Sequence, residues 1–179
     1  NAIQCFYQLL IDLESDARNH LRNTRLVSLI GFDRKSLLVG REKPLKLALH
    51  TINSNTSATL HILGESGSGK TTFIKHVLNE LISAQDIIDE IIWVDKPNNL
   101  TEVERDIDLR MRRNTDSVSL KLLLEYKNTV IIIDEADRLI KNQQSEFEEF
   151  LKNYQRAIII ISGSYFTPLI GVTTQIDLP

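Results

Sequence analysis

The stretch ATLHILGESGSGKT, residues 58–71, decides the fold of this chain. Its first six residues, Ala58–Leu63, form an apolar run of strand length. The next eight, Gly64–Thr71, fit the pattern G-x-x-x-x-G-K-[ST] without deviation, and a helix is predicted from Lys70 to Ser83. A strand, a glycine-rich loop and a helix in this order are the setting in which the pattern indicates a phosphate-binding loop.

The chemistry of a phosphate-binding loop explains each residue type. Glycines let the loop wrap tightly, so that successive backbone N–H groups converge on an anion, and the start of the following helix adds its free N–H groups. Lys70 is expected to reach the β- and γ-phosphates, and the Thr71 hydroxyl to ligate Mg²⁺. The residues predicted to bind the nucleotide here are Gly64, Glu65, Ser66, Gly67, Ser68, Gly69, Lys70, Thr71 and Thr72.

A second motif supplies acidic groups. The run VIIIDE, residues 130–135, is a β-branched strand that ends in two carboxylates. Asp134 is predicted to hold Mg²⁺ together with Thr71, and to contribute to the nucleotide site. Glu135 is predicted to be the catalytic general base that orients or deprotonates a water. Asp137 is interpreted as a solvated acid in the first turn of a helix.

The remaining pattern places these motifs in an α/β fold. Helices are predicted at 1–22, 41–53, 70–83, 100–113, 117–126 and 144–153. Strands are predicted at 58–63, 91–95, 129–133, 157–161 and 175–178, and segment 23–40 is predicted to be irregular. Short apolar strands that alternate with helices indicate a parallel sheet covered on both faces, a three-layered α/β domain.

Composition excludes several classes of protein. The 179 residues carry a net charge of −3, which argues against a domain whose main task is to neutralise a nucleic-acid backbone. One cysteine and four scattered histidines supply neither a disulfide framework nor a metal cluster. No apolar run approaches the roughly 20 residues of a membrane span. The arginines between Arg105 and Arg113 are interleaved with acids, which favours a solvent-exposed face with salt bridges. We therefore expect a soluble, cytoplasmic domain without membrane or nucleic-acid contacts of its own.

The last buried strand supplies a further candidate. It is followed by Ser162, Gly163 and Ser164. If this strand lies between the other two motif-bearing strands, Ser162 or Ser164 could sense the γ-phosphate; a simple turn is the alternative. Arg138 and Arg156 are weaker candidates for stabilising phosphate charge.

With these motifs the chain resembles the STAND nucleotide switches, and among them the NB-ARC domain of plant disease-resistance proteins. The resemblance covers about residues 37–179, which leaves 1–36 as an N-terminal helical segment and linker. It rests on LVGRE at 38–42, the phosphate-binding loop, IIWVD at 91–95, Asp134-Glu135, residues 158–164 and IDLP at 176–179.

The resemblance implies a five-stranded sheet of order 5-1-4-3-2 and places Gly40 and Arg41 at the nucleotide. It implies ATP or ADP with Mg²⁺ as cofactors. As partners it implies further domains of a longer parent chain, and other copies of the protein in a self-associated active state. Ser162, Gly163 and Ser164 stand where family members carry an arginine γ-phosphate sensor.

Three functions remain open, and the main expectation is the first of them, the nucleotide switch of an NB-ARC-type immune receptor. The first is a regulatory switch that holds ATP or ADP and hydrolyses slowly. The second is an AAA+ ATPase of the replication-initiator or transposition-regulator type that acts on DNA, which Glu135 suits better. The third is a scaffold that needs the nucleotide only to fold. Tight co-purifying ADP with negligible turnover would favour the switch, and steady turnover stimulated by DNA would favour the AAA+ ATPase. Failure to bind any nucleotide would leave only a structural role.

Overall fold

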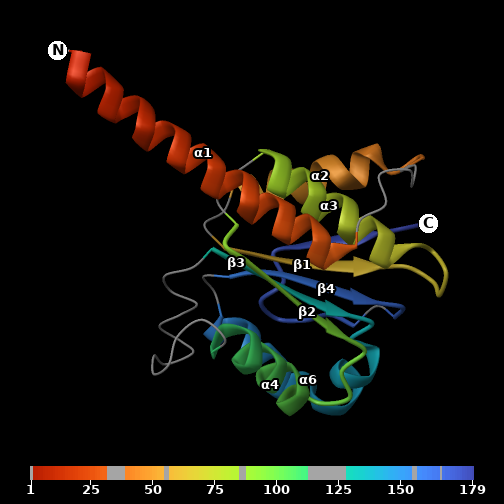
Figure 1. The fold of residues 1–179 in the computed structure, drawn as a ribbon. Coiled ribbons are helices and arrows are strands. Elements are labelled where there is room, and N and C mark those ends of the chain that lie inside the picture. Colours follow the sequence, from red (N-terminus) through yellow and green to blue (C-terminus); the bar gives the residue numbers. More distant parts are fainter. Residues whose placement is uncertain are drawn as a thin grey trace.

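A computed structural model describes residues 2–31, 39–54, 57–84, 88–112, 128–154, 157–165 and 167–179. Figure 1 shows a central sheet with α1, α2 and α3 on one face and α4 and α6 on the other. The helices are α1 (Ala2–Ile30), α2 (Glu42–Ser54), α3 (Lys70–Ala84), α4 (Leu100–Arg112) and α6 (Asp137–Asn153). The strands are β1 (Ala58–Leu63), β2 (Glu90–Asp95), β3 (Thr129–Asp134), β4 (Ile158–Gly163) and β5 (Thr174–Asp177). The expected three-layered α/β domain is confirmed.

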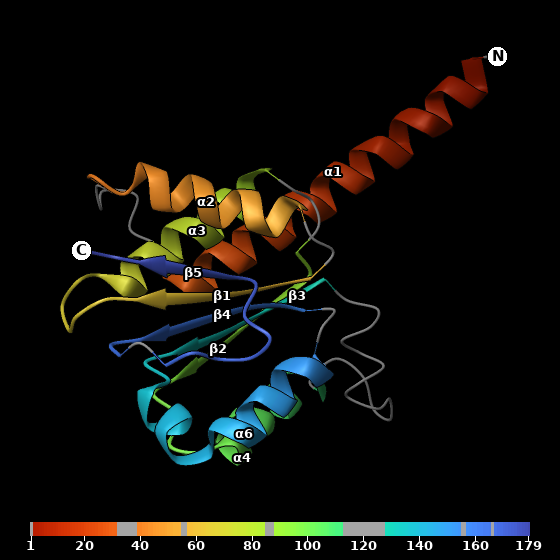
Figure 2. The same cartoon turned by 180° about the vertical axis from the view of Figure 1, so that it is seen from behind.

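The sheet is five-stranded and every pairing in it is parallel. Its order is β2-β3-β4-β1-β5, which confirms the predicted order 5-1-4-3-2. β4 therefore lies between β1 and β3, with Leu60 opposite Ile160 and Ile132 opposite Ile160 on the other side. Because parallel strands end at the same edge, the segments that follow β1, β3 and β4 meet there, at the end marked by the arrowheads in Figure 2.

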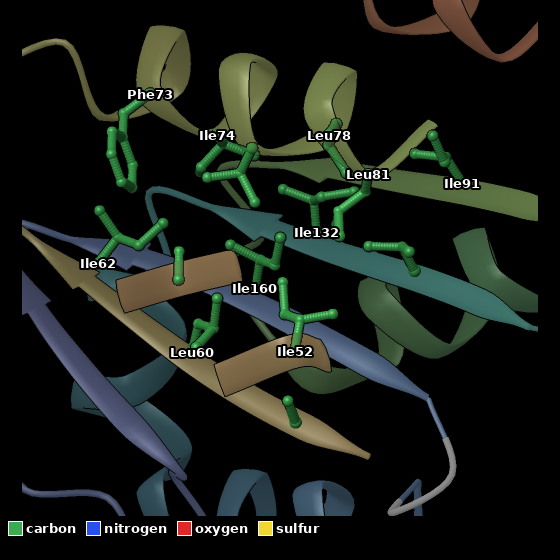
Figure 3. Packing of buried hydrophobic residues seen from close by; sticks show 14 of the residues in the cluster. Ile52, Leu60, Ile62, Phe73, Ile74, Leu78, Leu81, Ile91, Ile132 and Ile160 are labelled. Atoms are coloured by element: carbon green, nitrogen blue, oxygen red, sulfur yellow. The ribbon is translucent and has the colours of Figure 1, made fainter. Parts of the chain in front are cut away.

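Two apolar layers hold the sheet in place. On one face, Phe73, Ile74 and Leu78 of α3 pack over Leu60 of β1 and Ile132 of β3 (Figure 3). The other face packs against α4 and α6 through the residues Val103, Ile107, Met111, Leu139, Ile140, Phe147, Phe150 and Leu151. Strands buried on both faces need apolar side chains in both directions, which explains the unbroken isoleucine runs of β3 and β4.

The N-terminal helix is longer than expected. α1 continues to Ile30, whereas residues 23–30 were expected to be irregular, and Gly31 follows it with φ +55°. Leu26 is buried in the core on the α3 side, so tertiary packing stabilises this last part of the helix. In Figure 1 the N-terminal part of α1 projects beyond the body of the domain.

The helix predicted at 144–153 is longer in the structure, and its first turn contains Asp137, the residue interpreted as a first-turn acid. α6 begins at Asp137 rather than at residue 144, with a break in helical geometry at Gln143 (φ −141°, ψ 45°). The side-chain oxygen of Gln143 accepts a hydrogen bond from the Leu100 N–H at the start of α4, at 2.8 Å. The helix predicted at 117–126 lies outside the described residues.

The other predicted elements agree with the structure to within about two residues at each end. Among the described residues no helix is both long and apolar enough to cross a membrane.

Candidate nucleotide site

The loop between β1 and α3 is shaped by its glycines. Gly67 and Gly69 have φ angles of +84° and +77°, a region that residues with a Cβ atom rarely adopt. The Ser68 N–H donates to the Glu65 carbonyl at 3.1 Å, and the Phe73 N–H donates to the Gly69 carbonyl at 2.9 Å, the first bonds of turn and helix. The backbone therefore turns sharply and enters α3 with its first N–H groups free of helical partners.

Lys70 lies folded over this loop. Its Nζ donates to the carbonyls of Gly64 at 2.8 Å and Glu65 at 3.0 Å, and the residue is only 7% exposed. The ammonium has a third donor that neither carbonyl uses. The loop is open to solvent, since its residues Glu65, Ser66 and Gly67 are exposed. Thr72, in the first turn of α3, is exposed as well.

A hydrogen-bonded chain joins α3, β3 and β4 next to the loop. The Thr71 hydroxyl donates to Asp134 Oδ2 at 2.8 Å, and the Ser162 hydroxyl donates to Asp134 Oδ1. Asp134 and Ser162 are buried, with 3% and 0% exposure. The two residues predicted to hold Mg²⁺ are therefore in direct contact, although they are 63 positions apart.

Glu135 lies at the same edge with an unusual backbone. Its φ is +54°, and its N–H donates to Ser162 Oγ at 2.9 Å, so β4 holds this conformation. Its side chain is half-exposed and forms an ion pair with Lys96, with Nζ 3.3 Å from Oε1. Lys96, which follows β2, also has a positive φ of +49° and donates its N–H to the Asp134 carbonyl at 2.8 Å. Nothing in the sequence pattern indicated the involvement of Lys96.

Arg41, the residue just before α2, contacts the loop. Its guanidinium donates from Nη1 to the Gly69 carbonyl at 3.3 Å and from Nη2 to the Ser68 carbonyl. Gly40 precedes it with φ +74° and donates its N–H to Glu42 Oε1 at 3.3 Å. Arg41 thus lies at the predicted site, where it contacts the loop.

Other candidates lie elsewhere. The Arg138 guanidinium donates to Asn98 Oδ1 at 3.3 Å, and Arg156 lies outside the described residues. Asp137 lies in the first turn of α6, as predicted, but it is half-buried rather than solvated. Its Oδ1 accepts N–H bonds from Ser164 at 2.8 Å and Tyr165 at 3.2 Å. Asp137 therefore fixes the loop after β4 to the start of α6.

The residues present fit a nucleotide with Mg²⁺. The Ser68 hydroxyl is buried without a hydrogen-bond partner among the described residues, and a Cβ atom at Gly67 would meet nothing within 4 Å. A hydroxyl and one carboxylate are a donor set that suits Mg²⁺, which keeps several waters and takes phosphate oxygens as further ligands. In the described ranges no three His, Cys, Asp or Glu residues form a metal cluster. The ligand roles themselves stay predictions.

A buried histidine lies behind the site on β1. His61 is 1% exposed, and its Nε2 has no hydrogen-bond partner in the part of the chain that the structure describes. Burial lowers the pKa of this imidazole below 6.5, although the carboxylates of Asp137 and Asp177 act in the opposite direction.

This lowered pKa predicts a loss of stability in mild acid. The unfolded chain binds a proton near pH 6.5 that the folded His61 binds only at lower pH, so the free energy of unfolding falls as the pH drops through 6.5. We expect the Tm to fall less between pH 7.5 and 5.5 in His61→Gln than in the wild type. At this size each kcal/mol corresponds to about 2–4 °C. Calorimetry at the two pH values checks this, with His50→Gln as a control at an exposed histidine. If the Tm of His61→Gln falls with pH as much as that of the wild type, the prediction is contradicted.

Comparison with known proteins identifies the family of this chain. The sequence pattern of the AAA domain family matches residues 54–166, which include the loop, Asp134, Glu135 and Ser162. No curated protein sequence matches the chain significantly.

Two solved structures have a similar fold. Cdc6p from Pyrobaculum aerophilum superposes with a TM-score of 0.60 at 18% identity, over 82% of this chain and 48% of that one. The Walker-type ATPase paby2304 of Pyrococcus abyssi gives 0.52 at 16% identity, over 82% and 55%. The chain thus spans about half the length of these structures. Since the family pattern covers well over half of its residues, the chain belongs to the AAA domain family of P-loop NTPases.

Proposed function

We propose that this chain is the ATP-hydrolysing domain of an AAA-type ATPase, dependent on Mg²⁺. The observation that carries the proposal is the hydrogen-bonded chain of Thr71, Asp134 and Ser162, with Glu135 at its end, beside a phosphate-binding loop. Thr71 and Asp134 would hold Mg²⁺, which would supply positive charge to neutralise the phosphates. The chain's own residues supply the amide cradle, the Lys70 ammonium, the donor pair Thr71 and Asp134, and the half-exposed carboxylate of Glu135.

The second motif favours hydrolysis over simple binding. The Asp134 carboxylate is buried and bonded by two hydroxyls, so it is fixed. The Glu135 carboxylate is half-exposed and paired only with the solvent-exposed Lys96 among the described residues. An exposed ion pair of this kind contributes little to stability, so the side chain is free to turn toward a water. Two neighbouring carboxylates in such different settings suit the separate roles of metal ligand and general base.

The alternative is the nucleotide switch of an NB-ARC immune receptor. The family match supports the AAA class, and no comparison supports the NB-ARC reading specifically. The end of β4 also lacks the arginine γ-phosphate sensor that the resemblance to the switch family implies, since Ser162, Gly163 and Ser164 occupy that place.

Steady-state turnover separates these functions. We expect release of phosphate from ATP that requires Mg²⁺ and stops when EDTA is added. Tight co-purifying ADP with negligible turnover would favour the switch, and failure to bind any nucleotide would leave only a structural role. Addition of duplex DNA at about 0.15 M salt tests action on DNA. The net charge of −3 predicts no binding by this chain alone, since phosphate contacts by cations dominate such affinity.

Thr71 provides a prediction about the metal. Thr71→Ala removes the hydroxyl that contacts Asp134 Oδ2, so we expect ADP binding to weaken about tenfold in Mg²⁺ and to stay unchanged in EDTA. Titration with a fluorescent ADP analogue in the two buffers measures this. The matched control is Thr101→Ala, the exposed second residue of α4, as Thr71 is the second residue of α3. Equal weakening in both buffers would show that Thr71 does not act through the metal.

A further inference from the structure

The position of Arg41 shows a feature of the site that the sequence did not. Arg41 lies just before α2 and about 28 residues ahead of the loop that it contacts. Its two terminal nitrogens donate to two consecutive carbonyls of the loop, those of Ser68 and Gly69. Nη2 also lies 3.5 Å from the Pro179 carbonyl. The guanidinium therefore acts as a fork across two adjacent peptide groups.

The planar trans peptide links these contacts to the phosphate side of the loop. In each peptide group the C=O and the N–H point in opposite directions. The Ser68 carbonyl shares its peptide group with the Gly69 N–H, and the Gly69 carbonyl shares its group with the Lys70 N–H. A donor that fixes both carbonyls on one side therefore aims both N–H groups to the other side, and polarises them.

The packing around Gly69 supports a contact with the carbonyl side. A Cβ atom built on Gly69 would lie 3.0 Å from Arg41 Nη1, so the guanidinium fills the space that a side chain would take. The φ of +77° at Gly69 is a second reason for glycine at this position. Both terminal nitrogens donate to backbone carbonyls, so the guanidinium is turned toward the loop.

We propose that Arg41 is a positioning residue for phosphate binding, which aims the amides of Gly69 and Lys70 by holding their peptide groups from the opposite side. The inference rests on the proposed function, because it assumes that a polyphosphate occupies the loop. Arg41 then acts through the backbone and has no role in recognising the base.

A pair of ligands that share the triphosphate but differ in the base tests this role. Binding of Mg-ATP and of inorganic tripolyphosphate with Mg²⁺ is measured by calorimetry for the wild type, Arg41→Met and Arg41→Lys. Arg41→Met should weaken both ligands by the same factor, about tenfold to a hundredfold, since hydrogen bonds to charged groups are lost. The affinities of Arg41→Lys should lie between those of the wild type and Arg41→Met, because an ammonium cannot donate to both carbonyls in the planar arrangement of a guanidinium. Arg105→Met, an exposed arginine paired with its neighbour Asp106, should bind as the wild type does.

A second measurement distinguishes positioning from general stabilisation. Amide NMR spectra of the unliganded protein should show the largest shifts in Arg41→Lys at the N–H groups of Gly69 and Lys70, since their peptide groups lose a donor. Shifts spread evenly over the domain, with no excess at these two amides, would contradict the proposal. This variant keeps the positive charge, so it remains informative if Arg41→Met does not fold.

The remaining outcomes separate the inference from the function on which it rests. If the wild type binds neither ligand, the proposed function is wrong. If the wild type binds both and Arg41→Met binds both equally well, the function stands and the positioning role is wrong. If Arg41→Met weakens Mg-ATP but not tripolyphosphate, Arg41 contacts the adenosine and the positioning role is again wrong.

Discussion

Replacement of Lys70 by alanine is expected to weaken ATP and ADP binding about a hundredfold or more. The Lys70 ammonium donates to the carbonyls of Gly64 and Glu65, so it is held over the loop. The loop otherwise presents neutral amides, and Lys70 adds the full charge that faces the phosphates. Two charge-assisted hydrogen bonds of about 1.5–3 kcal/mol each account for this factor.

The control for this variant lies on the same helix. Lys75 is half-buried on α3, and its Nζ points to the Gly31 carbonyl at 3.5 Å, away from the loop. Lys75→Ala should leave nucleotide affinity unchanged in the same fluorescence titration. Far-UV circular dichroism of Lys70→Ala without ligand checks that the domain folds. A folded Lys70→Ala with the affinity of the wild type would show that the phosphates bind elsewhere.

Much of the fold could be predicted from local sequence because several strands are bounded by strong signals. The glycines of the loop fix the end of β1 and the start of α3, and β3 ends where two carboxylates follow an isoleucine run. The order of strands could not come from such patterns, since it depends on contacts between distant segments. It came from the resemblance, which gave the sheet order correctly although the comparisons support another class of P-loop protein.

The errors arose where tertiary contacts override local pattern. The apolar stripe of α6 starts at Leu139 and Ile140 and resumes at Phe147, but polar Gln143 and Gln144 interrupt it. Gln143 occupies a position of α6 where the helical pattern predicts an apolar residue. Its side-chain oxygen instead accepts the Leu100 N–H at the start of α4. The part of α1 beyond residue 22 likewise gains its support from packing next to α3.

The residues of the candidate site could be predicted from the sequence, but the hydrogen bonds and ion pairs between them could be predicted less well. Loop, Thr71, Asp134, Glu135 and Ser162 come together as expected. The Ser162 hydroxyl, considered as a phosphate sensor, donates to Asp134 and accepts from the Glu135 N–H. The contacts of Lys96 depend on a left-handed backbone conformation that its sequence does not signal. Side-chain contacts across strands thus require the structure.

The two acids of the second motif are expected to separate by function. Asp134→Asn keeps one oxygen for the Thr71 or Ser162 hydroxyl but removes the charge, so binding should become less dependent on Mg²⁺. Among the described residues the Glu135 side chain makes its ion pair with Lys96 and no hydrogen bond to either hydroxyl. Its backbone N–H, which donates to Ser162, is kept when the side chain is replaced. A change at Glu135 should therefore act on turnover and leave affinity intact.

Glu135→Gln is expected to lower the rate of ATP hydrolysis about 100- to 10,000-fold, the contribution of a positioned general base, with Mg-ATP affinity within about twofold of the wild type. The amide keeps the size of the side chain but accepts no proton. Phosphate release under saturating ATP and a parallel binding titration measure the two effects, with Glu149→Gln, an exposed glutamate on α6, as control. Lys96→Ala tests the ion pair separately: because it frees the carboxylate 3.3 Å away, it should not lower the rate as Glu135→Gln does. If Glu135→Gln hydrolyses ATP at the wild-type rate, Glu135 is not the general base. A nucleotide switch with a poor hydrolytic site then becomes the better explanation of the function.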